Sequence, residues 1–226
     1  MDATAAVSEY SLGEEIAHAI THGVAIPLSI AGLAVLVAFS TSYGNAWHIT
    51  SSSIYGASLI LCFTASTLYH SIPHPRAKRI LQQIDHATIF LLIAGTYTPF
   101  ALVNMREGWG WWLFGTVWSI AIIGMIFELF TRQRYPRISL GLYLGLGWLA
   151  LVAVKPMLET VGAGGLALLV AGGLFYSLGV IFYAWERLAY NHAVWHLFVL
   201  AGSALHFFAV LFYVVPDGGG LAGLSR

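Results

Sequence analysis

Seven long apolar segments dominate the 226-residue sequence, and they constrain the fold more than any other feature. They cover residues 16–40, 54–71, 80–103, 109–130, 138–157, 165–185 and 192–215. A helix that crosses a bilayer needs about 20 predominantly apolar residues, and each segment is close to that length. The sequence therefore predicts an all-α fold, an integral membrane bundle of seven transmembrane helices.

The scarcity of charge supports the same conclusion. Asp, Glu, Lys and Arg make up only 9% of the residues, whereas hydrophobic residues make up 58%. Soluble domains carry about 25% charged residues, so this chain cannot cover a globular surface that faces water. The domain organisation that we expect is a short tail over residues 1–15, one membrane domain over 16–215 and a second short tail over 216–226.

The positions of Lys and Arg predict the orientation in the membrane. Seven of the ten lie in the three loops on one side of the bundle, namely Arg76, Lys78, Arg79, Arg132, Arg134, Arg137 and Arg187. The other side has Arg106, Lys155 and Arg226. Because loops rich in Lys and Arg stay in the cytoplasm, we expect a cytoplasmic N-terminus and an external C-terminus.

Other residue types narrow the possible partners. The net charge is zero and no basic run occurs, so no nucleic-acid partner is expected. The single cysteine, Cys62, excludes an internal disulfide, and any metal must be held by His and carboxylate. Gly141 and Gly145 form a GxxxG motif in the fifth segment, and the sixth contains Gly172, Gly173 and Gly179. Such glycines favour close packing between helices, including contacts in a homo-oligomer.

A set of polar residues falls at the predicted cytoplasmic end. His70 ends the second segment, Asp85 lies about one turn into the third, and His192 and His196 open the seventh. Residues four apart share a helical face, so His192 and His196 can reach one ion, and Ser66 lies on the same face as His70.

Three neutral imidazoles leave one position of a tetrahedral zinc ion open to water, which is typical of catalytic sites. Asp85 is then the expected base for that water, and Ser66 is expected to hold the water or to donate to an oxyanion. The alternative interpretation is that these polar side chains only form hydrogen bonds between helices.

Four strings resemble those of a known family: EEIAHAITHG, STLYH, DHATIFLLIAGTYTPF and HAVWHLFVLAGSALHF, in the first, second, third and seventh segments. They are similar to the haemolysin III branch of the progestin and adiponectin receptor family. The resemblance implies a seven-helix bundle with a zinc ion near the cytoplasmic leaflet. It assigns the family's motif residues to Ser66, His70, Asp85, His192 and His196.

The resemblance also implies a function. The wider superfamily includes alkaline ceramidases, which suggests zinc-dependent hydrolysis of an amide or ester in a membrane lipid that enters from the inner half of a bacterial plasma membrane. One alternative is a membrane sensor or receptor with a structural zinc. Another is a pore-forming cytolysin, which the sequence disfavours because it offers no ring of charged side chains to line a path.

The roles of four further histidines stay open at this point. His18 and His22 lie four apart in the first segment, so they form either a second pair near the zinc site or part of the packing at the helix end. His86 points about 100° away from Asp85, which favours a packing role. His206 returns to the face of His192 about 20 Å deeper, which predicts a buried contact in a cavity.

Overall fold

The computed structural model describes residues 10–131 and 134–215, and nearly all of them are helical. The helices are α1 (Leu12–Tyr43), α2 (Ala46–Ser71), α3 (Pro75–Pro99), α4 (Gly110–Thr131), α5 (Pro136–Gly147), α6 (Val154–Thr160), α7 (Gly162–Ala184) and α8 (Asn191–Tyr213). A π-helical turn over Phe100–Asn104 extends α3, and a 3-10 segment over Trp148–Ala153 joins α5 to α6. No strand occurs in these described residues.

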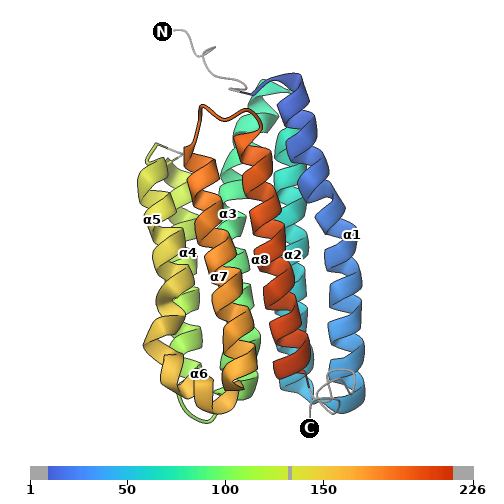
Figure 1. Ribbon diagram of the computed structural model, residues 1–226, viewed down its shortest axis with the longest axis vertical. Coiled ribbons are helices and arrows are strands. Elements are labelled where there is room, and N and C mark those ends of the chain that lie inside the picture. Colours follow the sequence, from blue (N-terminus) through green and yellow to red (C-terminus); the bar gives the residue numbers. More distant parts are fainter. Residues whose placement is uncertain (1–9, 132–133, 216–226) are drawn as a thin grey trace.

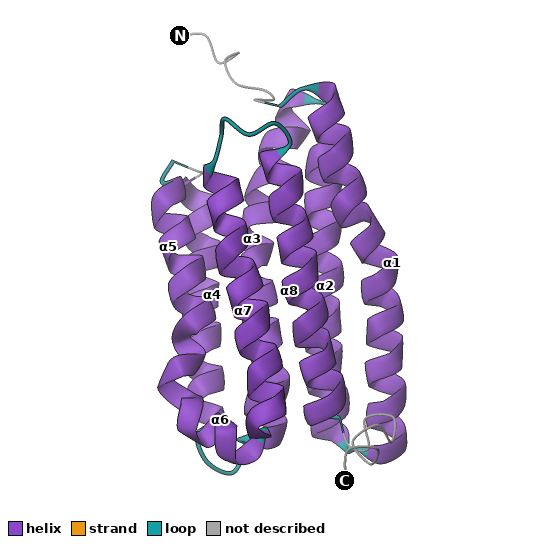
Figure 2. Cartoon of the chain, in the orientation of Figure 1, coloured by secondary structure: helices purple, strands orange, loops and turns teal. Residues whose placement is uncertain are grey.

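The helices form an up-and-down bundle with one common long axis (Figures 1 and 2). Seven described segments are long and apolar enough to cross a membrane; α3 with its extension is one of them, and Pro136–Thr160 is another. The predicted all-α bundle of seven spanning helices is therefore confirmed. Helix α1 packs against both α2 and α8, α3 lies between α2 and α4, and α7 packs against α8.

Several helices begin earlier than the hydropathy pattern predicts, and the starts of α2 and α3 differ most. Helix α2 starts at Ala46 rather than at residue 54, because Asn45 caps it, and its early residues Ser51 and Ser52 are fully buried. The Ser52 hydroxyl forms a hydrogen bond of 3.1 Å with Ser40 of α1, so polar residues here serve the helix interface. Helix α3 starts at Pro75, which suits the first helical position because it has no N–H to satisfy.

The earlier start of α3 corrects the expected depth of Asp85. This residue lies ten positions after Pro75, about 15 Å along the helix, rather than one turn from its beginning. It is consequently well inside the bundle, where a carboxyl group needs polar neighbours.

The fifth span is bent, and a tyrosine stabilises the bend. The Tyr97 hydroxyl donates to the carbonyl oxygens of Leu146 and Gly147, at 3.0 and 2.8 Å, and accepts a hydrogen bond of 2.8 Å from the Ala150 amide. Backbone groups at membrane depth must be paired internally, and this side chain pairs three that the distorted helix leaves.

The glycines of the fifth and sixth segments behave differently. Gly172 packs against His206 and the Gly202 carbonyl, and Gly179 packs against Phe198, so the close contact of α7 with α8 agrees with expectation. Gly141 and Gly145 are exposed, and a methyl group at either would meet nothing within 4 Å in the described chain. The prediction that this GxxxG motif packs closely inside the bundle is therefore wrong. That the motif forms a contact between two copies of the chain stays a prediction.

Helix α1 begins and α8 ends at opposite ends of the bundle, as an odd number of spans requires (Figure 1). The described basic residues in or next to the α2–α3, α4–α5 and α7–α8 connections lie at the end where α1 begins. Because that end is the more basic one, we place it in the cytoplasm as a prediction.

A pair of reporter fusions after Arg226 tests this orientation. We expect an alkaline phosphatase fusion to be active and a green fluorescent protein fusion to be dark, because both would lie outside the cytoplasm. Fusions that end in the loop between α4 and α5 are the control and should give the reverse result. A fluorescent fusion at Arg226 would contradict the charge argument.

Candidate functional site

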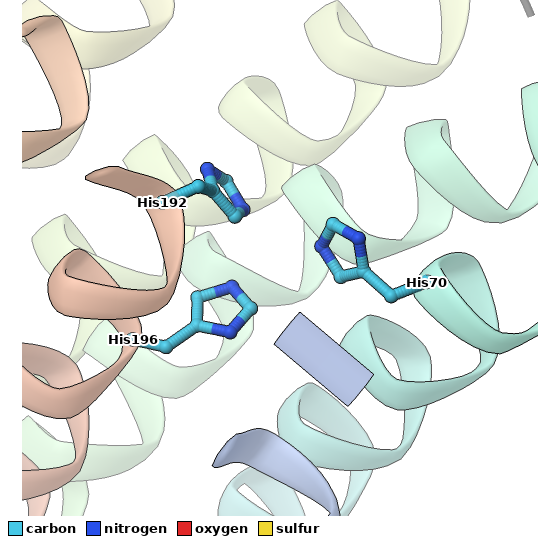
Figure 3. Close-up of side chains that lie close together, drawn as sticks. All are labelled: His70, His192 and His196. Carbon is cyan, nitrogen blue, oxygen red and sulfur yellow. The ribbon is translucent and has the colours of Figure 1, made fainter. Parts of the chain in front are cut away.

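Three histidines from two helices face one another at the end of the bundle where α1 begins. His70 lies in the last turn of α2, and His192 and His196 lie in the first two turns of α8 (Figure 3). One ligand nitrogen from each lies within 4.8 Å of the others, and all three side chains are buried. The structure thus brings together the three residues that the sequence pattern selected.

Hydrogen bonds on the far side of two rings fix which nitrogen faces the cluster. His70 Nδ1 lies 2.7 Å from the Glu15 carboxylate, and His196 Nδ1 lies 3.2 Å from the His18 carbonyl oxygen and 3.0 Å from the Thr21 hydroxyl. A carbonyl oxygen only accepts, so His196 Nδ1 carries the hydrogen and Nε2 keeps its lone pair. In neutral His70, Nδ1 likewise carries the hydrogen, because the Glu15 carboxylate only accepts, and Nε2 keeps its lone pair.

The other ring nitrogens of these three histidines lack partners in the described parts of the chain. Nε2 of His70, Nε2 of His196 and both ring nitrogens of His192 have no hydrogen-bond partner among the described residues, although all are buried. An unpaired buried polar atom costs about 1–3 kcal/mol. Lone pairs that converge from neutral imidazoles are the donor set that zinc prefers, so these residues fit a zinc ion.

A buried carboxylate holds His70 in place. Glu15 of α1 contacts His70 Nδ1 at 2.7 Å and Lys78 Nζ at 2.9 Å. Lys78 is itself buried and also donates to the Tyr69 carbonyl oxygen at 3.0 Å. A carboxylate behind a ligating histidine is a common feature of metal sites, because it fixes the ring and its tautomer. The sequence pattern alone predicted no role for Glu15 or Lys78. The run EEIAH, which contains Glu15, was the only indication of the first of them.

Ser66 and Asp85 lie beside the histidines, one layer deeper. The Ser66 hydroxyl forms a 2.8 Å hydrogen bond with His22 Nδ1, and the Asp85 carboxyl lies near Ser66. Asp85, His22 and Cys62 line a cavity of about 140 Å³ whose other walls come mainly from apolar residues of α3, α5, α7 and α8. Asp85 is not part of the groups of described side chains close enough to share one ion.

A larger opening lies on the other side of the site. It has a volume of about 750 Å³, and charged or polar side chains line much of it, among them Lys78, Arg79, His86, Arg137 and His192. His192 of the cluster thus lines the polar opening, and His22 lines the apolar cavity.

The structure also places the histidines that the sequence left open. His18 and His22 both join the cluster, and the His22 ring stacks on His196 with 3.5 Å between ring centroids. His86 lines the polar opening together with His192, and it is not part of the groups of described side chains close enough to share one ion. His206 lines the inner cavity, and its Nε2 lies 3.1 Å from the Leu169 carbonyl oxygen, which confirms the predicted buried contact.

Residues 10–207 match the family model described as Haemolysin-III related. The chain belongs to the haemolysin III family. It is 48% identical over 203 residues to Hemolysin-3 of Bacillus cereus, which covers 90% of this chain and 93% of the relative. The Hemolysin-3 homolog of Bacillus subtilis (strain 168) is 48% identical over 206 residues, 91% of this chain and 97% of the relative.

A human protein is a more distant relative of this haemolysin III chain. The monocyte to macrophage differentiation factor of Homo sapiens is 30% identical over 213 residues, which covers 89% of this chain and 84% of that protein. Family membership and the seven spanning helices together identify a multi-pass membrane protein. The names of the relatives specify no metal and no reaction, so the chemistry must be argued from the site.

Proposed function

We propose that this haemolysin III protein is a zinc-dependent hydrolase that cleaves an amide or ester bond of a lipid in the bacterial plasma membrane. The observation that carries the proposal is the convergence of nitrogens from His70, His192 and His196, which have no hydrogen-bond partner among residues 10–131 and 134–215, beside a cavity lined by Asp85. These three residues would hold the ion. When bound, zinc would polarise the scissile carbonyl group and make water a stronger nucleophile.

The chain's own residues would manage the protons. Asp85 is placed to take a proton from the attacking water and to return it to the leaving amine or alcohol, as a general base and then a general acid do. Ser66 lies between His22 and Asp85. A hydrogen bond from His22 to Ser66 and another from Ser66 to Asp85 would orient the carboxylate.

The two cavities suggest how a lipid would bind. The inner cavity of about 140 Å³ has mostly apolar walls, so it suits part of an acyl chain. The polar opening of about 750 Å³ contains Lys78, Arg79 and Arg137, so it suits a headgroup and water. The bond between headgroup and chain would then lie at the histidine cluster.

A sensor or receptor with a structural zinc is the second candidate function. It is favoured by the way the same histidines connect α2 to α8 at one end of the bundle. A cytolytic pore gains no support from the apolar walls of the inner cavity.

Lipid profiling tests the proposed activity in cells. We expect membranes from cells that produce Asp85→Asn to accumulate one class of lipid amide or ester, relative to cells that produce the wild type. The matching fatty acid or amine should fall by a similar amount. Identical lipid profiles at equal protein levels would contradict a hydrolase.

The position of Glu15 leads to a prediction about metal affinity. We expect Glu15→Gln to weaken zinc binding about 10–100-fold, because the neutral amide orients His70 less firmly and lowers its basicity. Competition with a chromophoric chelator measures this affinity. Glu14→Gln is the matched control: Glu14 caps the same helix in a capping box, which glutamine also completes, so its affinity should stay unchanged. Equal affinity in both variants would contradict the role of Glu15.

A further inference from the structure

His18 is the least explained side chain of the cluster. It is fully buried, and neither of its ring nitrogens has a hydrogen-bond partner within the described parts of the chain. A buried imidazole in this state forfeits the hydrogen bonds that it makes to water in the unfolded chain. A role in helix packing alone would be served better by an apolar side chain of similar size.

The ring centroids of His18, His70, His192 and His196 form an approximate tetrahedron, whereas the nitrogens that lie within 4.8 Å of one another are those of His70, His192 and His196. The ring centroid of His18 lies 4.7 Å from that of His70, 4.8 Å from that of His192 and 5.7 Å from that of His196. The other three separations are 5.1 Å for His70 and His192, 5.3 Å for His70 and His196, and 4.5 Å for His192 and His196.

These six distances match those expected around one ion. With zinc–nitrogen bonds of about 2.0–2.1 Å, an imidazole centroid lies roughly 3 Å from the metal, so four tetrahedral ligands have centroids roughly 5 Å apart. Each of the four rings carries at least one nitrogen with no hydrogen-bond partner in the described part of the chain.

We propose that His18 is the fourth protein ligand of the metal centre. The proposal rests on the zinc site of the proposed function and adds a ligand from α1 to it. A His18 nitrogen already lies within 4.8 Å of a His70 nitrogen and of a Glu15 oxygen. Glu15 is the weaker choice for the fourth position, because His70 and Lys78 both bind its carboxylate.

A fourth histidine ligand would also control the access of water and substrate to the metal. Four imidazoles close the coordination sphere, whereas catalytic zinc sites keep one position for water. Water or substrate therefore gains access when His18 moves away or when the coordination number rises to five. Helix α1 begins only six residues before His18, so a small displacement of its first turns would open the site.

X-ray absorption of the zinc-loaded wild-type protein tests the ligand count without any substitution. We expect multiple-scattering features from four imidazoles. A fit that requires three imidazoles and one oxygen would overturn the assignment of His18, and it would leave the three-histidine site intact.

Cobalt substitution tests the identity of the fourth ligand. We expect the wild type to show the intense visible bands of four-coordinate Co²⁺, and His18→Ala to show bands at least about twofold weaker because water raises the coordination number. Affinity for Co²⁺ should fall at least about tenfold. Added imidazole should restore the wild-type spectrum of His18→Ala. His86→Ala, which removes a neighbouring histidine outside the tetrahedron, should keep the wild-type spectrum.

The outcomes separate this proposal from the proposed function. A His18→Ala protein with the wild-type spectrum and affinity would show that His18 is no ligand, although the metal centre would stand. A wild-type protein that binds neither Co²⁺ nor Zn²⁺ would contradict the metal centre itself. His18→Asn provides a second, polar replacement whose loss of Co²⁺ affinity should equal that of His18→Ala.

Discussion

The double substitution His192→Ala/His196→Ala should abolish zinc binding. We expect about one zinc per chain in the wild type after growth in zinc-replete medium, and less than about a tenth of an equivalent in the variant, because two of the ligands are lost from one helix face. Elemental analysis of the purified proteins measures this. Since metal binding stabilises the folded state, added zinc should raise the melting temperature of the wild type only.

A matched control separates loss of the site from loss of any two imidazoles. His48 and His74 lie at the first turns of α2 and α3, where their rings cap backbone amides, and both are outside the cluster. His48→Ala/His74→Ala should retain full zinc content even where the missing caps lower stability by about 1 kcal/mol each. Full zinc retention in His192→Ala/His196→Ala would contradict the assigned ligands.

Asp85→Asn should separate metal binding from catalysis. Asp85 lies beside Ser66 on the cavity side of the histidines, so the amide should leave the imidazoles and the bound zinc in place. It removes the base for water, and we expect hydrolysis to fall by about 10²–10⁴-fold. Zinc content, melting temperature and turnover are measured on the same preparations.

The neighbouring residue provides the control for Asp85. His86→Gln changes the next position of α3, whose side chain faces the polar opening, and it should keep both zinc and most of the activity. Unchanged hydrolysis in zinc-loaded Asp85→Asn would refute the catalytic role of Asp85. Joint loss of zinc and thermal stability in Asp85→Asn would instead show that Asp85 is a required ligand.

The sequence alone predicts the fold well because one physical requirement dominates it. Lipid selects long apolar helices, so hydropathy locates all seven spans and the turns between them. It misplaces the start of α2 because the buried hydroxyls of Ser51 and Ser52 are satisfied by contacts that a hydropathy window does not include. It also overvalues Gly141 and Gly145, since a motif does not show which face of a helix meets a neighbour.

The candidate site is predictable where it depends on spacing within one helix. The separation of four residues places His192 beside His196, and the structure brings their nitrogens together. Ser66, one turn from His70, forms its hydrogen bond with His22. Contacts between helices carry no such signal. Glu15 and His70 are 55 residues apart, and their pairing depends on how α1 is rotated against α2. The same rotation brings His18 into the cluster, so spacing alone left its role open.

The most direct test of the zinc hydrolase is turnover by the purified protein in lipid nanodiscs, with a panel of lipid amides and esters. We expect the wild type to release a fatty acid from one class of lipid, to lose this activity when a chelator removes the metal, and to regain it when one equivalent of Zn²⁺ is added. Chelation and readdition should leave Asp85→Asn inactive throughout. A folded, zinc-loaded wild type that cleaves no lipid in the panel, or that cleaves one equally well without metal, would contradict the proposed function.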